Sequence, residues 1–189
     1  MNIKLRSVVL TATIAGIVSL STGLLAEDSP MATGDVSSSD GFESVVIALK
    51  TNPIRDPEAA CVALQIGMNL LMDLDGTVGP ADRVVLFPTL DGVEIVSDRM
   101  AMRGTLPNGK PKPYPAHLYC TTPSGEVPLP ELVYGFVNMP NAEVVVCPLC
   151  WNTRYSGEDP LYSDLETVRV GNGVDIHNLF LYADKVIDF

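Results

Sequence analysis

The sequence predicts a three-layer α/β fold, in which helices cover both faces of an open, mostly parallel five-stranded sheet. Short apolar runs rich in β-branched residues alternate along the chain with segments of helical periodicity, which is the pattern of βαβ units. The runs are short enough for strands that are buried on both faces. The predicted strands are residues 44–50, 83–87, 144–147, 166–170 and 185–189.

Helical segments lie between these runs. The first is residues 57–74, for which Asp56 is the expected N-cap and Pro57 the first helical position. Apolar residues, among them Cys61, recur there at helical spacing and predict one buried face. The other predicted helices are residues 91–102, 128–137 and 175–182, with a short one after Cys150 that runs towards Tyr155.

Residues 103–128 break this alternation. Glycine and proline recur through the segment and leave no periodic pattern, so we predict an irregular insertion. Loops of this length inside a compact domain are usually functional or disordered. The insertion contains His117-Leu-Tyr-Cys120, which makes it a candidate part of a functional site.

The N-terminus has the features of a secretory signal peptide. Lys4 and Arg6 are basic, the apolar stretch after them is short for a membrane span, and Ala26 is a small residue suited to cleavage. We expect residues 1–26 to be removed and the protein to be periplasmic or secreted, with an uncleaved anchor as the alternative. A flexible leader, residues 27–43, and a single domain, residues 44–189, would follow.

The charge of the chain is strongly negative. The formal net charge is −11, and loss of residues 1–26, which hold two basic residues and no acid, makes it −13. Phosphates would repel such a chain, so nucleic acid is a poor candidate for a partner. No basic amphipathic helix indicates a membrane surface either. The negative charge mainly supports solubility, and a partner with a basic face could exploit it.

The four cysteines, Cys61, Cys120, Cys147 and Cys150, all lie in the part expected to be exported. They allow three fully paired connectivities, and disulfides are the default expectation in an oxidising compartment. Cys147-Pro-Leu-Cys150 directly follows the predicted strand 144–147, where Pro148 cannot continue a sheet ladder. In open α/β sheets, ligands and reactive groups gather at this edge.

Four stretches carry a resemblance to a known family: Val45-Val-Ile-Ala-Leu-Lys-Thr51, Leu86-Phe87 with Asp91-Gly92-Val93, Val144-Val-Val-Cys147, and Ala183-Asp-Lys-Val-Ile-Asp-Phe189. Together they resemble the DsrE/DsrF-like family, which includes the TusD-type sulfur-relay subunits. The resemblance implies a small α/β domain that forms homotrimers or hexamers. It also implies that Cys147 carries a persulfide that is passed between proteins. Export, Cys150 and the insertion with His117 and Cys120 depart from the relay pattern.

Three interpretations of the cysteines follow. In the first, a Cys147 thiolate binds or transfers sulfur with a donor or acceptor protein, and Arg154 adds positive charge nearby. In the second, the pairs His117/Cys120 and Cys147/Cys150, with Cys61 as the remaining thiol, bind copper or zinc without catalysis. Met100 and Met102 border the insertion, and their thioethers are weaker candidates for copper ligands.

The third interpretation is a structural or redox role in an oligomeric interaction protein. Cys147 and Cys150 would pair with each other, or Cys120 would attach the insertion to Cys61 or Cys147. Trp151, beside the motif, would wall a pocket or pack against another subunit. We place the sulfur hypothesis first and the metal hypothesis second.

Overall fold

The computed structural model describes residues 42–72, 78–101 and 105–189. The predicted signal peptide and most of the predicted leader, residues 1–41, lie outside the described residues. Phe42 already belongs to the folded domain, since its backbone bridges Ala81. None of the helices in the described ranges has the length and apolar character needed to cross a membrane.

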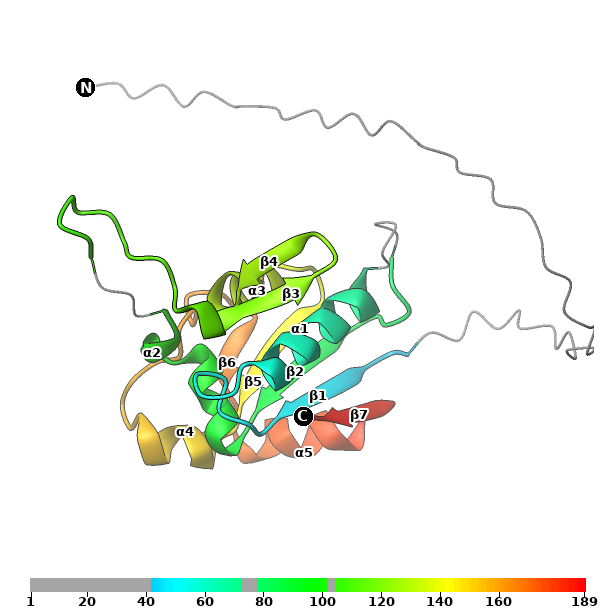
Figure 1. The fold of residues 1–189 in the computed structure, drawn as a ribbon. Helices are drawn as coiled ribbons and strands as arrows, with labels where there is room; N and C mark the ends of the chain where they lie inside the picture. Colours follow the sequence, from blue (N-terminus) through cyan, green and yellow to red (C-terminus); the bar gives the residue numbers. More distant parts are fainter. Residues whose placement is uncertain (1–41, 73–77, 102–104) are drawn as a thin grey trace, which may run out of the picture. The chain divides into compact units, whose positions relative to one another are not determined.

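A five-stranded parallel sheet forms the centre of the domain (Figure 1). Its spatial order is β6-β5-β2-β1-β7, and every neighbouring pair is parallel. The prediction of a mostly parallel five-stranded sheet is therefore confirmed. The strands are β1 (Val45–Leu49), β2 (Val84–Pro88), β5 (Ala142–Val146), β6 (Val168–Val170) and β7 (Lys185–Asp188).

Helices cover both faces of this sheet, as predicted. The helices α1 (Glu58–Leu71) and α3 (Leu129–Val137) lie on one face, and α5 (Gly173–Leu181) lies on the other (Figure 1). The strand order explains this division. The chain moves outward from β1 through β2 and β5 to β6, then returns to place β7 beside β1. Right-handed crossovers put the helix of the return step on the opposite face.

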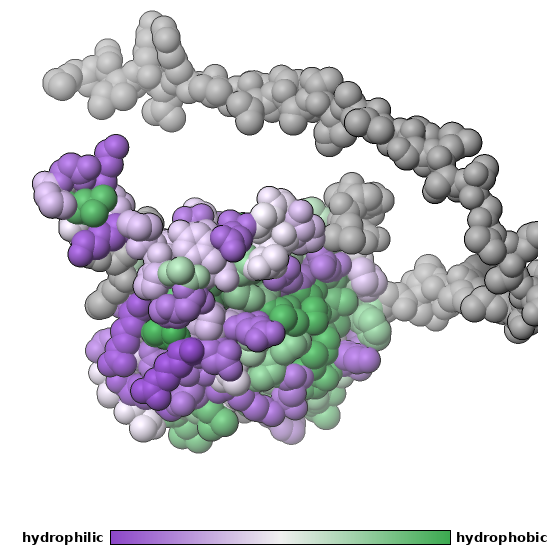
Figure 2. All heavy atoms as spheres, in the orientation of Figure 1, coloured by the Kyte–Doolittle hydropathy of each residue, from purple (hydrophilic) through white to green (hydrophobic). Residues whose placement is uncertain are grey.

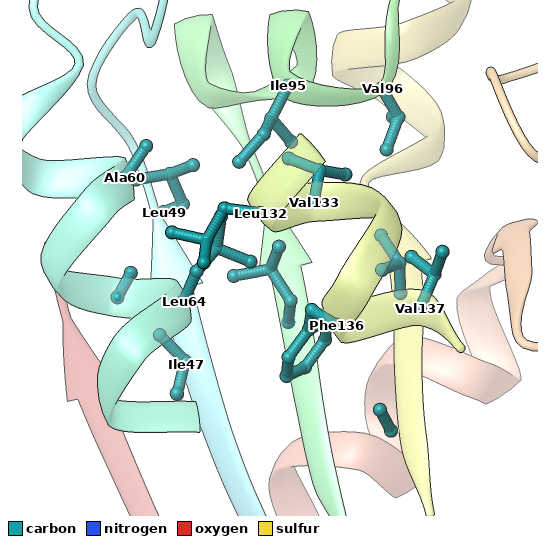
Figure 3. Packing of buried hydrophobic residues seen from close by; sticks show 14 of the residues in the cluster. Ile47, Leu49, Ala60, Leu64, Ile95, Val96, Leu132, Val133, Phe136 and Val137 are labelled. Atoms are coloured by element: carbon teal, nitrogen blue, oxygen red, sulfur yellow. The ribbon is translucent and has the colours of Figure 1, made fainter. Parts of the chain in front are cut away.

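Alternate residues of the strands supply two separate cores. Ile47 and Leu49 of β1 pack beneath α1 and α3, where Leu64 and Phe136 are fully buried (Figure 3). The opposite face is smaller and contacts α5 through Leu179. Its strand residues are Val46, Ala48, Val85, Phe87 and Val145.

Several element boundaries differ from the predicted ones for local reasons. The residue preceding α1 is Pro57, and no side chain caps the helix, so Asp56 is not the N-cap. The helix α5 begins two residues earlier than predicted because Asn172 and Asp175 form a capping box. The predicted helix over residues 91–102 is instead a 3₁₀ helix, η1 (Leu90–Val96), followed by the short α2 (Asp98–Ala101).

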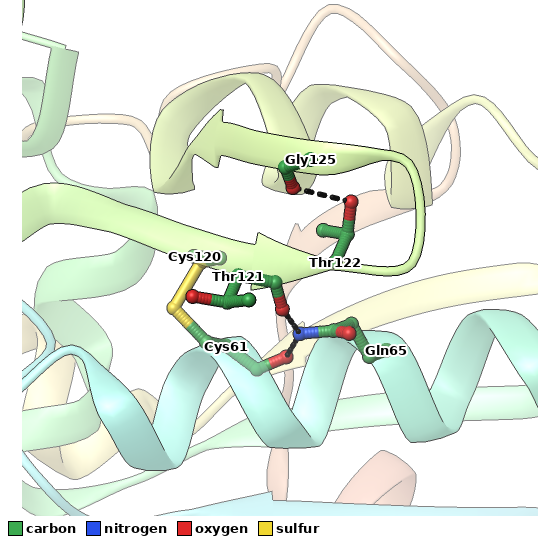
Figure 4. The surroundings of a disulfide bond; sticks show 6 residues. All are labelled: Cys61, Gln65, Cys120, Thr121, Thr122 and Gly125. Carbon is green, nitrogen blue, oxygen red and sulfur yellow. Dashed lines mark hydrogen bonds between the residues drawn. A yellow bond between two sulfur atoms is a disulfide. The ribbon is translucent and has the colours of Figure 1, made fainter.

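The insertion is more ordered than predicted. A 3₁₀ turn, η2 (Ala116–Leu118), leads into an antiparallel hairpin of β3 (Tyr119–Thr122) and β4 (Gly125–Pro128). The prediction of an irregular segment is therefore wrong over these residues. A Cys61–Cys120 disulfide joins the hairpin to α1 (Figure 4). The Gln65 side chain donates to the carbonyls of Cys61 and Thr121, both at 3.2 Å, and ties the same two elements together.

The surface of the domain is uneven in hydropathy. In the orientation of Figure 1, hydrophobic residues gather beside α1 and β1 and along the margin of α4 and α5 (Figure 2). Exposed apolar side chains on these elements include Val62, Leu149 and Leu181. The surface over the carboxyl ends of the strands is largely hydrophilic (Figure 2).

Candidate thiol site

Cys147 and Cys150 lie at the carboxyl end of β5, where the sequence predicted a reactive edge. The strand ends at Val146, Cys147 is the N-cap of α4 (Pro148–Arg154), and Pro148 occupies the first turn. The Cys147 N–H donates to the Pro88 carbonyl at 3.0 Å, which ties the motif to the end of β2. Both cysteines are free thiols and half-buried.

The turn after β2 supplies polar partners to Cys150. The Leu90 N–H donates to the Cys150 Sγ at 3.1 Å, and the Thr89 hydroxyl lies 3.5 Å from the same sulfur. Leu90 has a φ of +50°, a left-handed conformation that is uncommon for residues other than glycine. The backbone thus adopts an unfavourable angle at the residue whose N–H faces the thiol.

Close packing against β1 holds this turn in place. The Thr89 N–H donates to the Leu49 carbonyl at 2.9 Å, and the Gly92 N–H donates to the Thr89 carbonyl at 2.8 Å. A Cβ at Gly92 would lie 2.1 Å from the Leu49 carbonyl oxygen, so only glycine fits there. The donors to Cys150 therefore lie on a turn with little freedom to move.

These contacts favour the charged form of Cys150. Burial raises the pKa of the Cys150 thiol, but hydrogen bonds from Cys147, Thr89 and the Leu90 N–H, with the positive charge of Arg154, bring it below its ordinary value. The structure thus makes the thiolate of Cys150 easier to form than that of an ordinary cysteine. The sequence had singled out Cys147, whose role as the sulfur carrier stays a prediction.

Arg154 lies one turn after Cys150 on α4. Its guanidinium forms an ion pair with Asp91 and reaches the Cys150 carbonyl at 3.4 Å. The positive charge expected near the motif is therefore present. Because Asp91 directly follows Leu90, the ion pair also links α4 to the turn that contacts the thiol.

The predicted metal ligands are not brought together. Cys61 and Cys120 form the disulfide that joins α1 to β3, and a disulfide sulfur is not the thiolate that binds a metal. His117 is exposed and lines a cavity of about 520 Å³ beside that disulfide. Over residues 42–72, 78–101 and 105–189, no three His, Cys, Asp or Glu side chains are grouped to hold a metal ion. Met100 is buried in the core, and Met102 lies outside the described residues.

Trp151 has a different role from either predicted one. Its side chain is 2% exposed, so it belongs to the core and does not wall a pocket or face another subunit. Its Nε1–H donates to the Glu158 carbonyl at 2.9 Å, and its ring lies 4.5 Å from that of Tyr155. The Tyr155 hydroxyl donates to the buried Glu94 carboxylate. These contacts anchor α4 and so position Cys150.

Sequence reasoning missed the Thr89–Leu90 turn as part of the site. One available signal was that residues 83–87 and 144–147 were both predicted as strands of one mostly parallel sheet. The loops that follow such strands emerge at the same edge of the sheet. The left-handed conformation of Leu90 leaves no such signal, because it depends on packing against Leu49.

The sheet order and the helices on both of its faces form a DsrE-like α/β fold. The crystal structure of the YchN protein from E. coli has this fold and is similar to the chain, with a TM-score of 0.52 and 20% sequence identity. The similarity covers 78% of this chain and 99% of YchN. No family model matches the sequence, and no curated protein matches it.

Proposed function

We propose that this protein acts in sulfur-compound metabolism and that its Cys147/Cys150 pair binds and transfers sulfur. The observation that carries the proposal is the set of donors around Cys150, namely the Leu90 N–H at 3.1 Å and the Thr89 hydroxyl at 3.5 Å. Such donors favour the thiolate, which is the nucleophilic form of cysteine. The DsrE-like fold supports a sulfur-related role in general. The assignment of that role to Cys147 and Cys150 rests on the geometry of the site.

The proposed chemistry moves one sulfur atom at a time. The Cys150 thiolate attacks a sulfane sulfur, a new S–S bond forms, and the donor leaves with the electron pair of the broken bond. An acceptor thiolate then attacks the terminal sulfur of the persulfide, and Cys150 leaves as a thiolate again. No external oxidant or reductant is consumed. Cys147, which donates a hydrogen bond to Cys150, lowers the charge density on the sulfur.

The surroundings of the pair suit a protein donor or acceptor. Leu149, within the motif, is 79% exposed, and Leu90 is 56% exposed. Exposed apolar side chains beside a reactive group are typical of surfaces that contact other proteins. We therefore propose that a partner protein contacts these leucines while sulfur is passed to or from Cys150.

We also propose that the protein is exported and forms homo-oligomers. The Cys61–Cys120 disulfide suits an oxidising compartment. On α5, Val174, Phe180 and Leu181 are exposed apolar residues that a second copy of the chain could cover. Export rests further on residues 1–26, which lie outside the described residues.

Single-cysteine variants test which thiol carries sulfur. Cys147→Ala and Cys150→Ala proteins are treated with a sulfane-sulfur donor, and intact mass is measured before and after reduction. We expect Cys147→Ala to gain the mass of one sulfur and Cys150→Ala to gain none or far less. The alkylation rate of Cys150 in Cys147→Ala should rise at a higher pH than in the natural protein, because the hydrogen bond from Cys147 that lowers the Cys150 pKa is lost.

Three results would contradict the proposal. Absence of a sulfur adduct on both variants excludes sulfur transfer by this pair. Adduct formation on Cys150→Ala alone moves the role to Cys147, as the family resemblance implied. Stoichiometric copper or zinc in the purified protein, lost in both variants, would replace sulfur transfer with metal binding.

A further inference from the structure

A polar cavity of about 370 Å³ lies at the same edge of the sheet as the thiol pair. Loops that follow three different parallel strands line it, which is the usual place for a ligand in an open α/β sheet. Its volume is at the small end of the range for ligand pockets. The lining polar residues are Asn52, Arg55, Asp91, Glu94, Arg99 and Arg154.

Two of these residues connect the cavity to Cys150. Arg154 reaches the Cys150 carbonyl at 3.4 Å from the same helix. Asp91 directly follows Leu90, whose N–H donates to the Cys150 Sγ at 3.1 Å. Asp91 and Arg154 therefore form one side of the cavity and lie close to Cys150.

The charges in the cavity favour an anion. Three guanidinium groups face two carboxylates, and both carboxylates already have partners. Asp91 pairs with Arg154, and Glu94 accepts hydrogen bonds from Ser97 and Tyr155. Arg99 lies 3.8 Å from Glu94, and its side chain is 66% exposed, which leaves donors free.

Arg55 is the unpaired charge of the cavity. It makes no ion pair with any residue in the described part of the chain. Its backbone is held by Asn52, whose Oδ1 accepts from the Arg55 N–H at 3.1 Å and from the Ile54 N–H at 3.0 Å. The Arg55 guanidinium therefore extends from a turn whose backbone is fixed. Because the chain as a whole has a net charge of −11, such an unpaired positive charge marks a local site for an anion.

We propose that this cavity binds the sulfonate end of a small S-sulfo anion, –S–SO₃⁻, and presents its sulfane sulfur to Cys150. This inference rests on the proposed function, because it names the class of sulfur donor for the same thiol. Arginine forks recognise planar and tetrahedral oxyanions through paired hydrogen bonds. The three arginines would hold the oxygens, while the sulfane sulfur points toward the side of the cavity formed by Asp91 and Arg154.

The transfer step balances without a co-reactant. The Cys150 thiolate attacks the outer sulfur of thiosulfate, and a Cys150–sulfur bond forms. The bond between the two thiosulfate sulfurs breaks, and sulfite leaves with its electron pair. The products are a Cys150 persulfide anion and SO₃²⁻, so the total charge is unchanged.

The test compares a charged and an uncharged sulfur donor on Arg55→Gln in a Cys147→Ala background. Two products are followed by intact mass. Thiosulfate gives the Cys150 persulfide, and a neutral organic trisulfide, attacked at its central sulfur with loss of a thiolate, gives the mixed trisulfide of Cys150. We expect the rate with thiosulfate to fall by about tenfold or more, since a charge-assisted hydrogen bond is lost, and the rate with the trisulfide to stay unchanged. Lys185→Gln removes the same charge at the amino end of β7 and should change neither rate.

Binding without reaction gives a second measurement. Thiosulfate titrated into a Cys147→Ala/Cys150→Ala protein should bind, and Arg55→Gln should raise its Kd by about tenfold or more. Equal rates for Arg55→Gln and its parent with thiosulfate, or equal Kd values, would overturn the proposed anion site. Failure of both donors on the parent protein would instead overturn the proposed sulfur transfer itself.

Discussion

The Cys61–Cys120 disulfide should account for a large part of the stability of the domain. It joins residues 59 positions apart. Closing a loop of that length in the unfolded chain corresponds to about 4 kcal/mol at 25 °C in the loop-entropy treatment. For a urea dependence of about 2 kcal/mol per molar, the unfolding midpoint should fall by about 2 M when the bond is reduced.

The cleanest assay uses a Cys147→Ala/Cys150→Ala protein, in which the structural pair are the remaining cysteines. Urea unfolding with and without a reductant then reports this bond alone. Without reductant, the variant should match the natural protein within about 1 kcal/mol, because it loses two half-buried thiols. A midpoint that reductant leaves unchanged would refute the reasoning, since the hairpin would then be held without the disulfide.

Two further predictions concern the sheet and the surface of α5. Arg83 and Arg169 hydrogen-bond to the Glu143 carboxylate and, despite partial burial, lower its pKa below that of an ordinary glutamate. The stabilisation is present above the ordinary, unfolded-state pKa and is lost as the pH falls through the folded-state pKa. Glu143→Gln should therefore lower the free energy of unfolding more at pH 7 than at pH 3, and an equal loss at both would contradict this. For self-association, light scattering should give a mass above that of one chain, and Leu181→Glu should reduce it; a monomeric natural protein would contradict the proposed oligomer.

The sequence was sufficient for the sheet because burial on both faces leaves a clear signal. Val45–Leu49 and Val84–Pro88 are continuous apolar runs, and both are fully buried strands. The short edge strand β6 was predicted two residues too long, because its register with β5 begins at Val168, although the Thr167 carbonyl accepts from the Val144 N–H at 2.7 Å. The β3–β4 hairpin was missed because its prolines and glycines were interpreted as a loop. A disulfide and the packing of α1 stabilise it, and neither is visible in local sequence.

The site was predictable in position and only partly in composition. Cys147 and Cys150 lie where a cysteine pair after a central parallel strand should lie. Which thiol is favoured as the thiolate depends on the turn after β2, and that turn depends on the approach of Gly92 to the Leu49 carbonyl. Tertiary contacts of this kind cannot be obtained from the spacing of residues along one segment.

The two cysteine pairs of this chain have different surroundings, and this difference supports different roles. Cys120 is 1% exposed and Cys61 is 7% exposed, so their bond is shielded and closes a long loop. Cys147 and Cys150 are half-buried and lie at the open edge of the sheet, and the Cys150 sulfur accepts a hydrogen bond from the Leu90 N–H. Because the shielded bond attaches the insertion to α1, the half-buried pair is not needed for that attachment. A protein with a structural disulfide of its own can therefore keep a second pair of thiols free for chemistry.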